Sequence, residues 1–205
     1  MIPRLHLVTD DAVLQDARFA ARAIDLCATL RQEVAIHLRG RVFSGRKLFE
    51  LAEQLRPHAE RAGSLLLIND RVDVALSAHV PAVHLGARSL PVERVRALAA
   101  IREIGYSAHS SAEAVLAAQQ GANFILAGSI YATLSHPGAT PAGVQLLEAC
   151  VRLCPIPVLA IGGVTRERVA EVRTAGAHGV AVIRAVWHAP DPVQAATQFA
   201  KLLSA

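Results

Sequence analysis

Residues 157–184 read PVLAIGGVTRERVAEVRTAGAHGVAVIR, and the order of residue types in this stretch decides the predicted fold. Two short aliphatic runs, 157–161 and 179–183, flank a longer segment rich in Arg and Glu. Thr165 can cap a helix at its start, because a side-chain oxygen satisfies a free amide there, and Gly176 can end that helix in the left-handed conformation. A strand, a helix and a second strand in this order predict a βαβ unit with parallel strands.

The same alternation runs through the whole chain. We predict eight strands, at residues 5–9, 34–38, 65–68, 82–85, 103–107, 124–127, 157–161 and 179–183. We predict helices at residues 11–31, 44–62, 91–100, 110–120, 142–153, 165–175 and 190–203. Eight units in 205 residues average about 26 residues each, which is typical of a small (β/α)8 barrel. The sequence therefore predicts an α/β protein with one domain, residues 1–205, folded as a TIM barrel.

An open, doubly wound sheet is the alternative to the barrel. Open sheets of the dinucleotide-binding kind carry Gly-x-Gly-x-x-Gly after their first strand. Here Thr9-Asp10-Asp11 follows the first predicted strand, and this difference favours the barrel.

The composition excludes several classes of protein. Hydrophobic residues make up 53% of the chain and charged residues 19%, which excludes intrinsic disorder. No apolar run approaches the roughly 18 residues that a membrane span needs. The residues at the start lack the apolar stretch and cleavage site of a signal peptide, so we expect a cytoplasmic protein with no membrane partner. Three cysteines, Cys27, Cys150 and Cys154, are too few for a disulfide framework and are expected to be buried packing residues.

The charge balance is mildly basic, with 21 Lys and Arg against 17 Asp and Glu. The arginines are spread along the chain and aromatic residues make up only 4%, which does not favour a nucleic-acid surface. A basic pocket for a small anionic molecule fits better. A solvated surface without functional meaning is the other interpretation.

In a barrel the active site lies at the carboxyl ends of the strands. Gly162 and Gly163 follow the seventh predicted strand, and Ile183 and Arg184 end the eighth. Barrels commonly bind phosphate there through bare backbone N–H groups, and glycine lets the backbone approach the anion. We predict a phosphate site at these two turns; a tight turn without a ligand is the alternative.

Other strand ends supply further candidates. Arg39 and Arg41 could grip a second anionic group. Asn69 and Asp70 follow the third strand, where Asp70 could hold Mg²⁺, although a helix cap is the favoured interpretation. Ser107 and Thr133 are further candidates for substrate binding, and Ser129 is a candidate catalytic residue.

Histidines offer proton transfer near neutral pH. His109 and His136 lie in predicted loops at the site and are our candidates for a general acid or base. His6, His37 and His84 lie within apolar strands. Each of them could equally be a hydrogen-bonded residue of the core rather than a residue of the site. The long segment 128–143 is a candidate lid or binding loop.

The chain resembles the thiamine-phosphate synthase and TenI family. The segments that carry the resemblance are LHLVTD from Leu5, HLR from His37, INDR from Ile68, VHLG from Val83, GYSAH from Gly105, GSIYAT from Gly128, AIGGV from Ala160 and GVAVI from Gly179. The resemblance implies a (β/α)8 barrel, usually dimeric, that works in thiamine biosynthesis. It implies a thiazole phosphate held by Gly163 and the backbone of Ile183 and Arg184.

The family has two branches. In the synthase branch, a pyrimidine pyrophosphate and Mg²⁺ bind beside the thiazole phosphate, pyrophosphate leaves, and the thiazole nitrogen attacks the pyrimidine cation. In the TenI branch, the barrel aromatises a thiazole phosphate tautomer by moving a proton.

The chain departs from both patterns. Arg41 stands where the synthase pattern has a Lys, and His136 stands where that pattern has a second Lys. Gly86-Ala-Arg-Ser89 replaces Gly-Gln-Glu-Asp, whose Asp is a metal ligand, so that Asp70 keeps half of the expected metal pair. Ser129 replaces the His of the TenI pattern.

Three hypotheses follow. The first is a TenI-like isomerase that binds thiazole phosphate, needs no cofactor, and moves a proton with His136 or His109. The second is a diverged synthase, with Arg39, Arg41 and Asp70 serving the pyrophosphate and with Mg²⁺. The third is a non-catalytic phosphate-binding or regulatory protein. In each case we expect a homodimer without a nucleic-acid partner.

Overall fold

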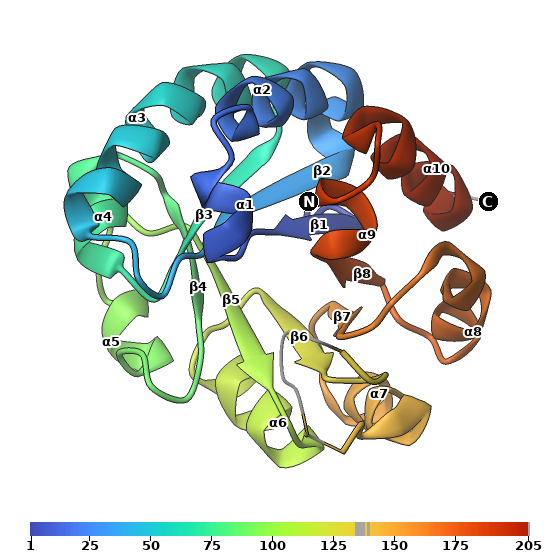
Figure 1. The fold of residues 1–205 in the computed structure, drawn as a ribbon. Helices are drawn as coiled ribbons and strands as arrows, with labels where there is room; N and C mark the ends of the chain where they lie inside the picture. Colours follow the sequence, from blue (N-terminus) through green and yellow to red (C-terminus); the bar gives the residue numbers. More distant parts are fainter. Residues whose placement is uncertain (134–137, 139, 205) are drawn as a thin grey trace.

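Eight parallel strands form a closed barrel in the computed structural model, which describes residues 1–133, 138 and 140–204 (Figure 1). The strands are β1 Leu5–Val8, β2 Val34–Leu38, β3 Leu65–Asn69, β4 Ala82–Leu85, β5 Glu103–Ala108, β6 Phe124–Gly128, β7 Val158–Ile161 and β8 Gly179–Val182. Leu5 of β1 is in register with Val34 of β2 on one side and Val180 of β8 on the other. This pairing closes the ring, so the predicted barrel is confirmed over the open sheet.

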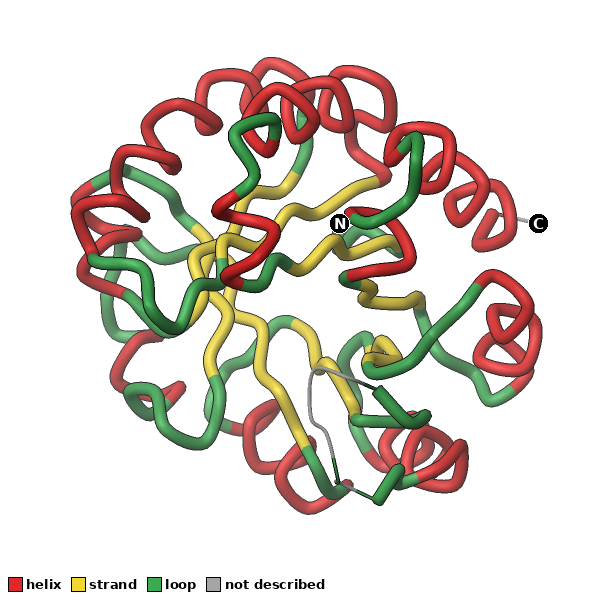
Figure 2. The backbone as a smooth tube through the Cα atoms, in the orientation of Figure 1, coloured by secondary structure: helices red, strands yellow, loops and turns green. Residues whose placement is uncertain are grey.

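Helices surround the strands (Figure 2). They are α1 Asp11–Gln15, α2 Phe19–Leu30, α3 Gly45–Ala62, α4 Val72–Ser77, α5 Val92–Arg96, α6 Ser111–Gln119, α7 Gly143–Leu153, α8 Val169–Thr174, α9 Arg184–Trp187 and α10 Pro192–Ser204, with short 3-10 turns at Arg31–Glu33 and Arg166–Arg168. In the part of the chain that the structure describes, no helix is long and apolar enough to cross a membrane.

Three predicted helices differ from the observed ones, and the one predicted at residues 91–100 spans only Val92–Arg96. The single helix predicted at residues 11–31 is interrupted, because Asp16 is extended and its carboxylate binds Arg18 and Arg22. The helix predicted at residues 165–175 begins as a 3-10 turn, and Thr165 does not cap it. Instead the Thr165 hydroxyl hydrogen-bonds Glu167 and lowers the pKa of that carboxyl. Gly176 does adopt the predicted left-handed conformation, with φ 85°.

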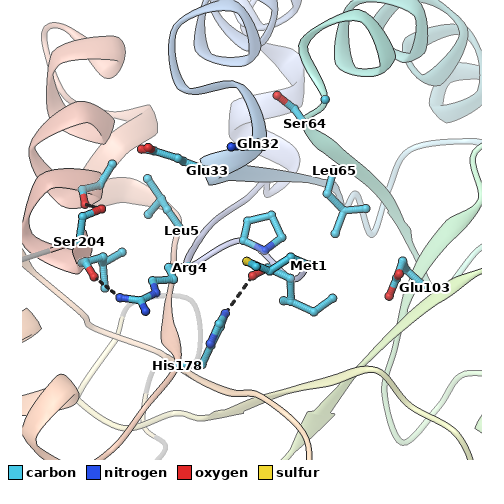
Figure 3. Close-up of a pocket in the computed structure, with 15 residues that line it drawn as sticks. Met1, Arg4, Leu5, Gln32, Glu33, Ser64, Leu65, Glu103, His178 and Ser204 are labelled. Carbon is cyan, nitrogen blue, oxygen red and sulfur yellow. Dashed lines mark hydrogen bonds between the residues drawn. The ribbon is translucent and has the colours of Figure 1, made fainter.

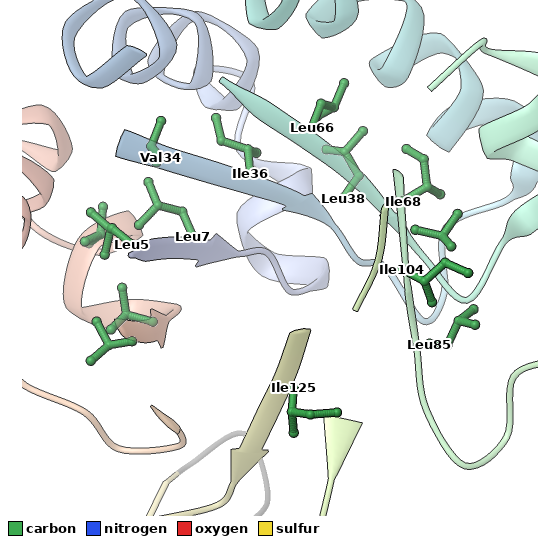
Figure 4. Packing of buried hydrophobic residues seen from close by; sticks show 14 of the residues in the cluster. Leu5, Leu7, Val34, Ile36, Leu38, Leu66, Ile68, Leu85, Ile104 and Ile125 are labelled. Carbon is green, nitrogen blue, oxygen red and sulfur yellow. The ribbon is translucent and has the colours of Figure 1, made fainter. Parts of the chain in front are cut away.

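The strands are buried on both faces, which explains their nearly continuous apolar sequences. Alternate side chains such as Leu5, Leu7 and Ile36 point outward into the layer between barrel and helices (Figure 4). A second, smaller apolar cluster fills the barrel interior and includes Phe124 and Leu126. All three cysteines are buried and free, as predicted.

A pocket of about 570 Å³ lies at the amino ends of the strands (Figure 3). Its polar groups already bind the backbone near the two chain ends. Arg4 donates to the carbonyl of Leu203 at 2.7 Å, and His178 Nε2 lies 2.9 Å from the carbonyl of Ile2. These bonds tie the start of the chain and α10 across the amino-terminal end of the barrel.

Gly105 makes room for the interior packing. It is in register with Phe124, and a Cβ at residue 105 would collide with the Phe124 ring and with His84 Nδ1. A larger residue therefore overpacks the barrel interior.

We predict that Gly105→Ala lowers the free energy of unfolding by about 1–3 kcal/mol, the usual cost of overpacking a core. Urea unfolding monitored by circular dichroism measures this change. Gly86→Ala is the matched control, because a Cβ at Gly86 has no heavy atom within 4 Å. Equal stability of Gly105→Ala and the parent protein would contradict the packing described here.

Candidate active site

A cavity of about 860 Å³ opens at the carboxyl ends of the strands. Residues from all eight strand ends line it, from Val8 after β1 to Arg184 after β8. The candidates from the sequence that line this cavity are Arg39, Asn69, Asp70, Ser107, His109, Ser129, Thr133, Gly163, Ile183 and Arg184. Arg41 is exposed and does not line it, and His136 lies outside the described residues.

The turn after β7 needs its two glycines, because the segment after β6 packs closely against them. Gly162 and Gly163 have φ values of 97° and 63°, which an L side chain rarely adopts. Arg168 donates to the carbonyl of Gly163 at 2.6 Å, and its guanidinium lies 4.3 Å from the centre of the Tyr131 ring. This bond fixes the orientation of the Gly163 peptide.

Backbone amides next to this turn are available to an anion. The N–H groups of Gly163, Ile183 and Arg184 make no hydrogen bond with any described residue. Because β7 and β8 are neighbours, their two turns lie side by side at the mouth of the barrel. This is the geometry that phosphate binding in barrels uses.

Charged side chains gather at the ends of β2, β3 and β4. Arg39 follows β2, its backbone N–H donates to Thr9 Oγ1 at 2.8 Å, and its side chain is half-buried. Burial lowers the pKa of the Arg39 guanidinium, and the charge of Arg41 lowers it further. Arg88 follows β4 and is exposed at the cavity.

Asp70 does not cap the helix that follows it, so the favoured interpretation of this residue was wrong. The N-cap residue of α4 is Arg71, and it makes no side-chain cap bond. Asp70 takes a left-handed φ of 61° and accepts a hydrogen bond from Ser89 Oγ at 2.5 Å. Ser89 Oγ in turn accepts from the N–H of Gly86 at 2.9 Å. Asp70 thus joins the loops after β3 and β4.

Two charged residues of the cavity, Arg88 and Arg168, were not among the candidates from the sequence. Arg88 lies in the Gly86–Ser89 run that departs from the family pattern, and this departure was the available signal. Nothing in the local sequence around Arg168 distinguishes it from Arg166, two residues earlier, which donates to the Gln198 side chain and does not line the cavity.

A family model described as thiamine monophosphate synthase matches residues 5–186. The chain belongs to this family. The thiamine-phosphate synthase of Chloroflexus aurantiacus is 39% identical over 202 residues, which cover 98% of this chain and 93% of that protein. The thiamine-phosphate synthase of Salinispora arenicola is 37% identical, over 98% of this chain and 97% of that protein.

Solved structures agree with this family and fold. A thiamine phosphate pyrophosphorylase from Pyrococcus furiosus superposes with a TM-score of 0.85 at 32% identity, over 98% of this chain and 95% of that one. A 3-hexulose-6-phosphate synthase from Salmonella typhimurium superposes with a TM-score of 0.73 at 18% identity and shares the fold alone.

His109 is the candidate proton-transfer residue whose environment the structure describes. Its Nδ1 lies 2.5 Å from the carbonyl oxygen of Gly128. A carbonyl only accepts hydrogen bonds, so Nδ1 donates to it, and Nε2 is the ring nitrogen that remains for proton transfer. No described residue hydrogen-bonds that Nε2, which leaves it free to act as a base.

Below the cavity, the barrel interior of this family member contains three buried histidines. His6, His37 and His84 come from β1, β2 and β4, and their rings surround Phe124. His84 Nε2 lies 2.8 Å from Ser107 Oγ, a cavity residue. Burial lowers the pKa of all three imidazoles, to about 3 for His37. All three are therefore neutral at pH 7.

Pro3, His6, His37 and Asn69 form a series of hydrogen bonds. Because both rings are neutral, each imidazole has one donor and one acceptor nitrogen, so one assignment of the protons satisfies the series. The Pro3 carbonyl only accepts, so His6 Nε2 carries the proton that donates to it at 3.1 Å. His6 Nδ1 then accepts from His37 Nε2 at 2.8 Å, which leaves His37 Nδ1 as an acceptor.

Asn69 Oδ1 lies 3.2 Å from that His37 nitrogen. Rotating the carboxamide by 180° exchanges its oxygen for its NH2 group, which can donate to His37. We therefore expect the Asn69 carbonyl oxygen to face the cavity as a hydrogen-bond acceptor.

Nitrogen NMR would show His6 and His37 as Nε2–H tautomers; Nδ1–H tautomers would contradict this arrangement.

The neutral histidines also predict acid sensitivity. Their pKa in the unfolded chain is near 6.5 and is lower in the folded protein, so protons bind preferentially to the unfolded chain. The free energy of unfolding therefore falls as the pH drops below about 6.5, by up to about 1.4 kcal/mol per pH unit for each histidine. His37→Gln removes one such group, and urea unfolding between pH 7.5 and 5 should show a shallower decline.

His188→Gln is the control for this experiment, because His188 is exposed. It should keep the pH dependence of the parent protein. If His37→Gln also keeps the full decline, His37 is not a buried neutral group.

Proposed function

We propose that this protein is a thiamine-phosphate synthase, which joins a thiazole phosphate to hydroxymethylpyrimidine pyrophosphate. The observation that supports this proposal is the placement of anion-binding groups on two opposite sides of one cavity. In the closed ring of eight strands, β3 lies four strands from β7, and β4 lies four strands from β8. The loops after β3 and β4 therefore face the turns after β7 and β8 across the mouth, and the loop after β2 lies next to the β3 loop, two strands from β8.

Each side suits one substrate. The amides of Gly163, Ile183 and Arg184 would hold the thiazole phosphate. Across the mouth, Arg39 and Arg88 would hold the pyrophosphate, for which the guanidinium fork is well shaped. A cavity of about 860 Å³ is within the range of small-molecule sites and has room for the two reacting carbon and nitrogen atoms to meet between these ends.

The reaction needs charge stabilisation more than proton transfer. The bond between the pyrimidine methylene carbon and a pyrophosphate oxygen breaks, and pyrophosphate leaves with both electrons. The thiazole ring nitrogen donates its lone pair to the resulting cation, and a carbon–nitrogen bond forms. No proton changes place, so neutral imidazoles in the site are compatible with the chemistry. Arginines next to the leaving group stabilise its developing charge, an effect worth a few kcal/mol per contact.

The family resemblance also implies Mg²⁺, which usually binds proteins through one or two carboxylates. Of the described residues that line the cavity, Asp70 is the one carboxylate, and its Oδ1 already accepts a bond from Ser89. The described residues also contain no cluster of three or more His, Cys, Asp or Glu that could hold a metal. These residues do not fit a Mg²⁺ site built on two carboxylates.

Aromatisation of a thiazole phosphate tautomer is the second candidate function. The free Nε2 of His109 at the cavity supports it, because a neutral imidazole nitrogen with a lone pair can remove a proton. Ser129 also lines the cavity but has no basic group.

The test incubates purified protein with both substrates and measures thiamine phosphate and pyrophosphate. We expect the two products in equal amounts. Arg39→Ala should lower kcat/KM by about 100-fold, the usual effect of removing one charge-stabilising group. Arg94→Ala, a substitution of an exposed arginine on α5 that does not line the cavity, is the control and should change it little.

The other hypotheses give different results in the same experiment. Acceleration of tautomer aromatisation without any thiamine phosphate would replace the synthase with the isomerase. Binding of thiazole phosphate without turnover in either assay would support the non-catalytic protein.

A further inference from the structure

The charged side chains that line the cavity have an unusual balance. Among the described lining residues, four arginines, Arg39, Arg88, Arg168 and Arg184, accompany the single carboxylate of Asp70. A cavity of this charge attracts polyanions and repels cations.

Arg168 already has protein partners, the Gly163 carbonyl and the Tyr131 ring. The side chains of Arg39 and Arg88, by contrast, form no hydrogen bond or ion pair with any described residue. Arg39 is half-buried, and burial of its cation costs free energy that the nearby charges of Asp70, Asp11 and Asp10 offset only in part, since the net shift of its pKa is downward. These two arginines follow β2 and β4, on either side of Asp70 after β3.

The Asp70 carboxylate is engaged within the protein. Ser89 Oγ donates to Asp70 Oδ1 at 2.5 Å and is itself oriented by the Gly86 amide. Ser89 stands where the family pattern has its second metal-binding Asp. Here its hydroxyl hydrogen-bonds Asp70, which stands at the position of the first metal ligand. Arg88, next to Ser89, adds a positive charge to the same loop.

We propose that Arg88, together with Arg39, holds the diphosphate group without a bound divalent cation, so that guanidinium groups neutralise the leaving group. This inference rests on the proposed function for the identity of the diphosphate. Two planar guanidinium groups can bind several phosphate oxygens in bidentate fashion, which a single metal ion on one carboxylate does not reproduce.

Inorganic pyrophosphate is the probe, and isothermal titration calorimetry at pH 8 measures its binding. In EDTA we expect binding by the parent protein, with a Kd that changes less than about threefold when Mg²⁺ replaces EDTA. Arg88→Ala should weaken binding in EDTA by about 10- to 100-fold, the range typical of losing one charge-assisted contact. Arg94→Ala is the matched control and should bind as the parent does, and circular dichroism confirms that each variant is folded.

A reverse experiment restores the carboxylates. The double variant Arg88→Glu/Ser89→Asp places acidic residues beside Asp70. We expect its pyrophosphate binding to be lost in EDTA and restored by Mg²⁺, with a Kd at least tenfold lower with Mg²⁺ than in EDTA, whereas the Kd of the parent protein should depend little on Mg²⁺.

The outcomes separate this inference from the synthase proposal. Pyrophosphate binding by the parent protein only with Mg²⁺, or equal binding by Arg88→Ala in EDTA, would overturn the inference even if thiamine phosphate is formed. Metal-independent binding that requires Arg88 would support it even if the condensation assay fails.

Discussion

The pairing of β8 with β1 is the interaction on which the site depends. Val180 lies in register with Leu5, and this contact converts eight parallel strands into a ring. In an open sheet the ends of β2 and β8 would be separated by most of the sheet. In the ring they border one cavity, so the basic loops after β2 and β4 and the glycine turn after β7 can act on one pair of ligands.

Buried histidines in the barrel interior affect the stability of the fold and also contact residues of the cavity. Side chains that point inward from the strands include histidines that would be costly if charged, and burial keeps them neutral. Hydrogen bonds connect His6 to Pro3 and to His37, His37 to Asn69, and His84 to Ser107. The space for the His84 and Phe124 rings exists because Gly105 lacks a side chain. The histidines at the bottom of the cavity and beneath it are therefore uncharged, and the charged side chains lie at the strand ends around its mouth.

The sequence predicted the parts that depend on local patterns. Strand positions followed from aliphatic runs, and each observed strand lies within one residue of its predicted bounds. Candidates at the strand ends, such as Ser107 and Gly163, line the cavity because strand direction alone carries them there. The prediction for Asp70 was wrong, since its left-handed φ and its bond to Ser89 arise from contact between two loops 19 residues apart. Arg88 and Arg168 were missed for the same reason, because tertiary contacts decide which loop arginines face the cavity.

The most direct test of this account is a crystal structure grown in EDTA with thiazole phosphate and inorganic pyrophosphate. We expect the thiazole phosphate at the amides of Gly163 and Ile183, and the pyrophosphate across the mouth on Arg39 and Arg88, with oxygens about 3 Å from the guanidinium nitrogens. Both anions on the same side of the mouth, or a pyrophosphate that contacts neither arginine, would contradict it.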